Sequence, residues 1–265
     1  MESGYISMRI CIKVGTSTLT HPSGHLNIRQ VESLCKVISD LKNAGNQVVL
    51  VSSGAIGRGV GKLGLKHRPG DMPTKQAAAA VGQCELMYIY DKAFGAYNHT
   101  VAQILLTGAD FDHPERLDNF RNTLFRLLEL DALPIINEND TIVTDEISIG
   151  DNDTLGALVA VNAGADLLVL MSDIDGLYTA DPHKHPDAKL IHEVAELTPE
   201  ILALGDGKGS ELATGGMSTK LSAAKIATAH GCDMIITNGK NPQVLYDILD
   251  GIPVGTRFLR KGAAK

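Results

Sequence analysis

ATGGMSTKLSAAK, residues 213–225, is the stretch that best indicates how the chain folds and what it binds. Gly215-Gly216 allows a tight turn, and the alanine-rich run after it has good helix propensity. A glycine turn that leads into a helix presents unpaired N–H groups and the positive end of the helix dipole, which together favour an anion. Lys220 in the first turn is unfavourable for the helix alone but favourable if a phosphate lies in front of it. The alternative is an ordinary surface helix capped by Ser218 or Thr219, and the residue order of a Walker P-loop is absent.

Size and composition are typical of a soluble globular protein. The 265 residues suffice for one large α/β domain or two small ones, and 44% are hydrophobic and 21% charged. The net charge of −7 argues against an extended basic surface for nucleic acid, although a small phosphorylated ligand needs only a few local cations. Residues 1–7 have no signal-peptide pattern and are expected to form a disordered tail, and no apolar run could span a bilayer. We therefore expect neither a nucleic-acid partner nor a membrane partner.

The cysteines indicate a reducing compartment. They are widely separated, without a C-x-x-C pair, and lie in predicted strands and helices or at their junctions: Cys11, Cys35, Cys84 and Cys232. Such residues are expected to be buried free thiols in the cytoplasm rather than disulfides or metal ligands.

Short apolar runs alternate with helical patterns, which predicts βαβ units and hence a parallel sheet. The expected strands are residues 9–14, 47–51, 101–106, 133–136, 166–171 and 234–237. The expected helices are residues 27–44, 73–97, 116–130, 150–163, 213–229 and 242–249. A hairpin is expected at 141–149, an ordered loop at 172–182 and a flexible segment at 205–210.

Residues 59–64 match G-x-G-x-x-G, but a dinucleotide site is not expected there. The motif lies several residues beyond its strand, and no second strand ending in Asp or Glu follows about twenty residues later. The prediction for residues 57–64 is a glycine-rich loop, mobile or closely packed.

Four predicted strands end in polar clusters: Lys13-Val-Gly-Thr-Ser, Ser52-Ser-Gly, Asn137-Glu-Asn-Asp and Ser172-Asp. Ligands of open α/β sheets bind beyond the carboxyl ends of the strands, so these clusters should line one crevice together with the helix N-termini near Asp153 and Met217. Lys13 is unusual inside an apolar strand. The alternative is an edge strand in which this lysine faces water.

The side chains available in this crevice favour phosphoryl transfer. No Ser-His-Asp set and no H-E-x-x-H motif is present. What remains is two lysines, glycine turns with backbone donors, and the acids Asp140, Asp151, Asp153 and Asp173. Phosphoryl transfer requires mainly positioning and charge neutralisation, which these groups supply. Residues 150–154 lack the further ligands of a Ca²⁺ loop, so we assign no metal ligand.

With these residues identified, the chain resembles the glutamate 5-kinases of the amino acid kinase family over residues 8–258. The matching motifs are Lys13-Val-Gly-Thr-Ser, Val51-Ser-Ser-Gly-Ala-Ile, Ile136-Asn-Glu-Asn-Asp, Gly150-Asp-Asn-Asp, Asp175-Gly-Leu-Tyr-Thr-Ala-Asp-Pro and Thr214-Gly-Gly-Met-Ser-Thr-Lys. The Asp175 motif also marks aspartate and UMP kinases. The resemblance implies one three-layer αβα sandwich over residues 1–265 with a mainly parallel central sheet. Many relatives carry a C-terminal PUA domain, which we expect this chain to lack.

The resemblance also implies an activity and the residues that perform it. ATP would phosphorylate the side-chain carboxylate of L-glutamate, the first step of proline synthesis, with Mg²⁺ carried on the phosphates. Lys13 and Lys220 would contact the transferring phosphoryl group, and Asp153 would hold the two ammonium groups in place. The residues matching the glutamate site are Ser53, Gly54, Asp140 and Asn152, with Asp140 as acceptor for the α-ammonium. The residues matching the ATP site are Lys13, Ser172, Asp173, Thr214, Gly215, Gly216, Met217, Ser218, Thr219 and Lys220.

The resemblance also implies inhibition by proline, and we expect the chain to form a homo-oligomer. Two alternative functions stay open at this stage. One is another kinase of the same fold, acting on aspartate, carbamate, UMP or acetylglutamate. Residues 137–140 help to distinguish these substrates. A substrate with a free α-amino group needs an anionic acceptor such as Asp140, whereas acetylglutamate has no free α-amino group and needs no such acceptor. The other is a catalytically inactive regulator that binds a nucleotide or an amino acid, but a mere binder has no need for both lysines and Asp153.

Overall fold

A computed structural model describes residues 7–21, 25–144, 149–182, 184–205 and 216–262. The fold is built on an eight-stranded sheet with the order β3-β4-β2-β1-β5-β7-β8-β6. The strands are β1 (Arg9–Val14), β2 (Gln47–Ser52), β3 (Val101–Leu106), β4 (Leu133–Glu138), β5 (Leu167–Ser172), β6 (Glu193–Val194), β7 (Asp233–Asn238) and β8 (Thr256–Phe258). Every pairing is parallel except that of β7 with β8. The expected mainly parallel sheet is confirmed.

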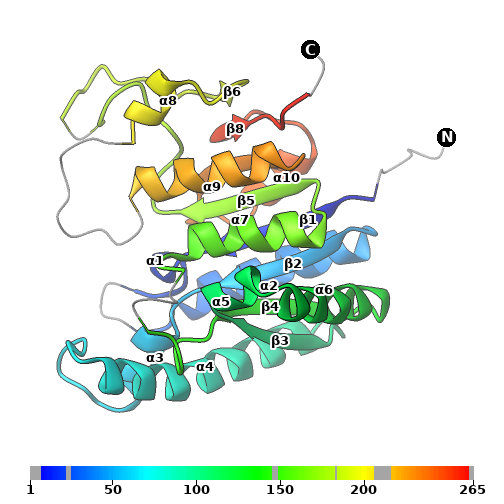
Figure 1. Cartoon of the computed structure of the whole chain (residues 1–265), viewed down its shortest axis with the longest axis vertical. Helices are drawn as coiled ribbons and strands as arrows, with labels where there is room; N and C mark the ends of the chain where they lie inside the picture. Colours follow the sequence, from blue (N-terminus) through cyan, green and yellow to red (C-terminus); the bar gives the residue numbers. More distant parts are fainter. Residues whose placement is uncertain (1–6, 22–24, 145–148, 183, 206–215, 263–265) are drawn as a thin grey trace.

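Helices cover both faces of the sheet, so the expected three-layer αβα arrangement is confirmed (Figure 1). The longer helices are α2 (Ile28–Asn43), α3 (Ala55–Lys62), α4 (Met72–Gly95), α6 (Pro114–Glu129), α7 (Asn152–Ala163) and α9 (Met217–Ala229). The shorter ones are α1 (Thr16–Leu19), α5 (Gly108–Asp112), α8 (Pro199–Ala203) and α10 (Val244–Leu249). Helices α6, α7 and α9 pack on one face, and α2, α4 and α10 pack on the other. None of the helices in the described ranges is long and apolar enough to cross a membrane.

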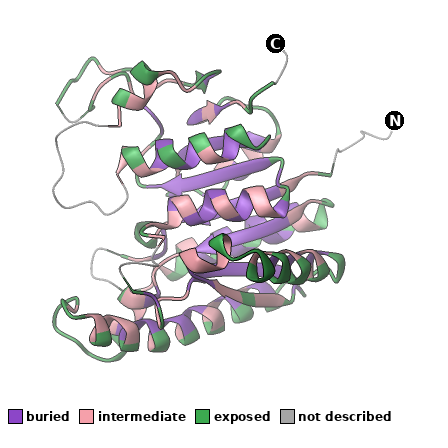
Figure 2. Ribbon diagram, viewed as in Figure 1, coloured by how far each residue is buried: buried purple, intermediate pink, exposed green. Residues whose placement is uncertain are grey.

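The central strands are buried on both faces (Figure 2). Their side chains still alternate, because successive residues of a strand point to opposite sides. In β1, Cys11 belongs to the core under α7 and α9, whereas Ile10 and Ile12 belong to the core under α2 and α4. By the same alternation Lys13 shares the face of Cys11, which is the face covered by α7.

The prediction of a loop at residues 57–64 is wrong, because Ala55–Lys62 form helix α3. A Cβ at Gly59 would lie 1.7 Å from Ala78 O, and a Cβ at Gly82 would lie 1.7 Å from Ala55 O. The glycines therefore allow α3 and α4 to touch backbone to backbone. The intrinsic cost of glycine in a helix is about 1 kcal/mol, which close packing against a neighbouring helix can offset.

Other local predictions have mixed outcomes. The helix expected at residues 27–44 is α2, which Asn27 caps by accepting a hydrogen bond from the Gln30 backbone N–H. All four cysteines are free, but Cys84 on α4 is exposed rather than buried. The short elements α1, α5, α8, β6 and β8 were not predicted. Residues 141–144 form no strand, and the expectations for residues 1–6, 145–148 and 206–210 lie outside the described residues.

Candidate active site

Lys13, Asp153 and Lys220 meet at the carboxyl ends of the central strands. The Lys13 ammonium lies 2.6 Å from Asp153 Oδ1, and the Lys220 ammonium lies 3.0 Å from Asp153 Oδ2. All three residues are buried, with exposed fractions of 8% for Lys13, 2% for Asp153 and 4% for Lys220. One carboxylate thus bridges two lysines that are separated by more than 200 positions in the sequence.

Three different elements deliver these side chains. Lys13 comes from β1, which lies between β2 and β5 in the middle of the sheet, so the alternative of a water-facing edge strand is wrong. Gly156 makes room for it, because a Cβ there would lie 3.3 Å from Lys13 Cβ. Asp153 is in the first turn of α7, whose N-cap Asp151 accepts a hydrogen bond from the Thr154 backbone N–H at 2.8 Å.

Lys220 lies in the first turn of α9, which begins after Gly216 without a side-chain cap. Capping by Ser218 or Thr219 is therefore wrong. Thr219 instead contacts Asp153, since its Oγ1 lies 3.1 Å from Asp153 Oδ2 and 2.8 Å from Gly216 O. Met217 and Ser218 lie in the same turn, whereas the predicted site residues Thr214 and Gly215 lie outside the described residues.

The electrostatics of this cluster favour an anionic ligand. Burial alone would raise the pKa of Asp153, but the ammonium groups of Lys13 and Lys220 outweigh burial and lower it below its usual value. Asp153 is therefore ionised at neutral pH, and the three side chains together carry one net positive charge. The first turns of α7 and α9 add the positive ends of two helix dipoles. A phosphoryl group fits these surroundings, because it supplies the negative charge that they lack.

A second group of polar residues lies at the ends of β2 and β4. The Asn152 side-chain amide donates to Ser53 Oγ at 2.7 Å and to Asn137 Oδ1 at 3.0 Å. Gly54, the N-cap of α3, has a φ of +106°, which favours glycine over any residue with a side chain. The structure thus brings together three of the predicted glutamate-site residues and adds Asn137, which belongs to the strand-end cluster but had no predicted role.

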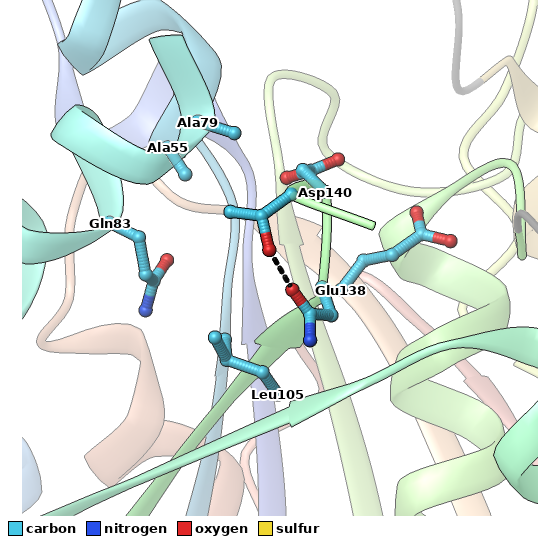
Figure 3. Close-up of a pocket in the computed structure, with 8 residues that line it drawn as sticks. Ala55, Ala79, Gln83, Leu105, Glu138 and Asp140 are labelled. Carbon is cyan, nitrogen blue, oxygen red and sulfur yellow. Dashed lines mark hydrogen bonds between the residues drawn. The ribbon is translucent and has the colours of Figure 1, made fainter. Parts of the chain in front are cut away.

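Asp140 lines a pocket beside this group, together with Ala55, Ala79, Gln83, Leu105, Glu138, Asn139 and Thr141. Figure 3 shows Glu138 and Asp140 on one side of the pocket, with Gln83 opposite. Burial and the nearby Glu138 carboxylate raise the pKa of Asp140 to about 6, against the opposing effect of Arg68. Glu138 also accepts a hydrogen bond from the Ile149 backbone N–H at 2.7 Å. An Asp140 carboxylate placed in this way gains most from a cationic ligand, which would favour its ionised form.

Ser172 is the last residue of β5, on the other side of β1, and Asp173 follows it. The Ser172 hydroxyl donates to Asp173 Oδ1 at 3.0 Å, and Met171 O accepts from the Gly15 backbone N–H at 3.3 Å. These contacts place the end of β5 beside the end of β1, where Lys13 lies. In the described part of the chain, no group of three or more His, Cys, Asp or Glu residues could hold a metal ion.

Comparison with known proteins adds a family to this geometry. The profile of the amino acid kinase family matches residues 8–238. Glutamate 5-kinase of Clostridium perfringens is 53% identical over 259 residues, which is 96% of each chain. Glutamate 5-kinase of Listeria innocua is 52% identical over 264 residues, covering 98% of this chain and 96% of that one.

Solved structures with lower identity share the fold. Carbamate kinase from Giardia lamblia bound to AMP-PNP has a TM-score of 0.69 and 21% identity, covering 96% of this chain and 99% of that one. Isopentenyl phosphate kinase of T. acidophilum has a TM-score of 0.64 and 19% identity, covering 94% and 99%. At these identities the likeness concerns the fold alone.

Proposed function

The chain belongs to the amino acid kinase family, among its glutamate 5-kinases, and we propose that it transfers the γ-phosphoryl group of ATP to the side-chain carboxylate of L-glutamate. The product is L-glutamyl 5-phosphate, which starts proline biosynthesis. The observation that carries the proposal is the buried Lys13–Asp153–Lys220 cluster. A substrate carboxylate is already a nucleophile, so the reaction needs no general base. It needs positive charge around the phosphoryl oxygens, which the two ammonium groups supply.

The three residues divide the work between them. Lys13 and Lys220 neutralise negative charge on the phosphoryl group while one glutamate oxygen bonds to phosphorus and the bond to the ADP oxygen breaks. Asp153 fixes both ammonium groups and reduces their mutual repulsion before the substrates arrive. Because Asp153 contacts the lysines and not the substrates, it acts as a positioning residue. Mg²⁺ would arrive with ATP on its phosphate oxygens and neutralise further charge there, and we assign it no protein ligand.

The substrates take the two sides of this cluster. On one side ATP would lie along Ser172, Asp173 and the first turn of α9; the roles of Thr214 and Gly215 remain predictions. On the other side glutamate would lie against Ser53, Gly54, Asp140 and Asn152. Asp140 would accept the α-ammonium, and the backbone N–H groups at the start of α3 would bind the α-carboxylate. This arrangement supports glutamate over UMP, carbamate or acetylglutamate, since none of these has a free α-amino group.

A substrate panel tests the proposal directly. ADP release would be measured with glutamate, aspartate, acetylglutamate, carbamate and UMP, and hydroxylamine would trap any acyl phosphate as a hydroxamate. We expect a hydroxamate with glutamate and at most slow ADP release with the others. Release of ADP with a different substrate would identify another kinase of this fold. Tight binding without turnover would identify a regulator.

We further propose that proline inhibits the enzyme at the amino-acid site. Proline shares the α-carboxylate and a cationic amino group with glutamate but lacks the side-chain carboxylate, so it could pair with Asp140 without reacting. Inhibition should then be relieved by raising the glutamate concentration. Asp140→Ala should weaken the binding of both glutamate and proline. Inhibition that persists at saturating glutamate would place the proline site elsewhere.

Two broader predictions accompany this function. The four free thiols support a cytoplasmic location, because cysteines persist as thiols in reducing compartments. Assembly into a homo-oligomer stays a prediction, which sedimentation velocity at several protein concentrations would test.

A further inference from the structure

Four amide side chains form a hydrogen-bonded row from the edge of the sheet to the amino-acid site. Asn152 Nδ2 donates to Asn137 Oδ1 at 3.0 Å, and Asn137 Nδ2 donates to Gln83 Oε1 at 3.0 Å. Gln83 Nε2 then donates to Gln103 Oε1 at 3.3 Å. We call Asn152, Asn137, Gln83 and Gln103 the amide row. They come from α7, β4, α4 and β3, so four separate elements meet through it.

The amide row has a direction, because an amide nitrogen only donates and an amide oxygen only accepts. The N–H group of each member donates to the amide oxygen of the next. Rotating one inner amide by 180° would therefore place two N–H donors against each other on one side and two oxygens against each other on the other side. The two inner members, Asn137 and Gln83, are 2% and 7% exposed. A buried amide that loses its partner costs about 1–3 kcal/mol. Asn137 is therefore held from two sides: its Nδ2 donates to Gln83 Oε1, and its Oδ1 accepts from the Glu138 backbone N–H at 2.9 Å.

This direction decides which atom Asn152 offers to a ligand. Its nitrogen already donates to Asn137 and Ser53, and it lies 3.3 Å from Ser52 O. Among the described residues, no group donates a hydrogen bond to Asn152 Oδ1. The amide row thus leaves an acceptor oxygen, and not a donor, at the site that also contains Ser53 and Gly54.

We propose that Gln83 is a positioning residue for substrate recognition, because together with the Glu138 backbone N–H it fixes Asn137 and thereby makes Asn152 present its oxygen. This proposal rests on the proposed function and assigns the oxygen to the α-ammonium of glutamate, beside Asp140. Gln83 also lines the pocket that contains Asp140 (Figure 3), so it borders the amino-acid site as well as orienting it. A donor at this position would repel an ammonium, so the orientation of one amide affects which substrate binds.

Gln83→Met tests this role, because methionine keeps the length of the side chain and removes the acceptor for Asn137. We expect KM for glutamate to rise about tenfold, the scale of one hydrogen bond, while kcat and KM for ATP stay within about twofold. Gln83→Glu should restore KM to near the parental value, since a carboxyl oxygen still accepts from Asn137. Tyr88→Met is the matched control, because Tyr88 is an exposed residue of the same helix.

A double-mutant cycle separates this role from general damage. Asn137→Leu removes the amide through which Gln83 acts, so adding Gln83→Met to it should raise KM for glutamate by less than about twofold. Full additivity would overturn the proposal, as would an unchanged KM in Gln83→Met or equal changes in the two KM values. Thermal denaturation of each variant would show that the compared proteins are folded. If the parent gives no hydroxamate from glutamate, the proposed function fails and this inference fails with it; if the parent is active, only the inference is at stake.

Discussion

Asp140→Asn should stabilise the folded protein and at the same time weaken the binding of glutamate. Burial and Glu138 raise the pKa of this carboxyl from 3.8 to about 6. A shift of that size corresponds to about 3 kcal/mol, which we reduce to about 1–2 kcal/mol because solvent reaches part of the side chain. The folded chain binds this proton more tightly than the unfolded chain. The favourable contribution is therefore complete below pH about 4 and is lost as the pH rises through about 6.

The substitution removes the charge and keeps the shape of the side chain. At pH 8 the free energy of unfolding should rise by about 1–2 kcal/mol, and at pH 4 it should hardly change. KM for glutamate should rise by about 10–100-fold, because a hydrogen bond to a charged group is lost. In the parent, kcat/KM for glutamate should fall about tenfold per pH unit below about pH 6, as Asp140 becomes protonated.

Urea denaturation at pH 4 and pH 8, together with steady-state ADP release, measures these effects. Asp91→Asn serves as the control, since Asp91 is an exposed carboxylate on α4. A variant that is less stable at pH 8 and binds glutamate normally would refute the reasoning. It would mean that Asp140 is ionised for a contact within the protein and not for the substrate.

Three further substitutions test the phosphoryl site and the helix that borders it. Lys220→Ala should lower kcat by about 10²–10³-fold, the scale for one preorganised charge donor, and a kcat within threefold of the parent would make Lys220 dispensable. Asp153→Asn should lower kcat far more than it raises KM for ATP or glutamate, because an organiser of the lysines acts on the transition state. A normal kcat with a large KM shift would make Asp153 a binding residue instead. Gly82→Ala should destabilise the protein by more than about 2 kcal/mol in urea denaturation, because the added Cβ would meet Ala55 O at 1.7 Å.

The sequence predicted the parallel sheet because its signals are local. Strands such as β1 and β5 are short apolar runs, and the helices between them carry their own caps and propensities. Helix α3 was missed for the opposite reason. Its glycines lower helix propensity, and their value lies in the contact with α4, more than fifteen residues further along the chain. Strand β8 was missed because three residues give no recognisable period.

The candidate site was partly predictable for a related reason. Lys13, Asp153 and Lys220 could be proposed from motifs, but their meeting at one carboxylate is a tertiary fact. The amide row could not be predicted at all. Gln83 and Asn137 are 54 positions apart, and a glutamine within a helix gives no sign of its partner. Such residues become visible only when hydrogen-bond partners are traced outward from the site.

The residues that are unfavourable in their own strand or helix are the ones that lie together in the candidate site. A lysine in the middle of a buried strand, a lysine in the first turn of a helix, and a partly buried carboxyl beside another carboxyl are each unfavourable alone. Lys13 and Lys220 become favourable through Asp153, which compensates one of their two charges, and a phosphoryl group would compensate the other. Asp140 has no such compensation from Glu138, which raises its pKa further. The Arg68 charge opposes this shift only in part, so the ionised carboxyl would gain from a further cation, and an α-ammonium is the cation that an amino acid brings.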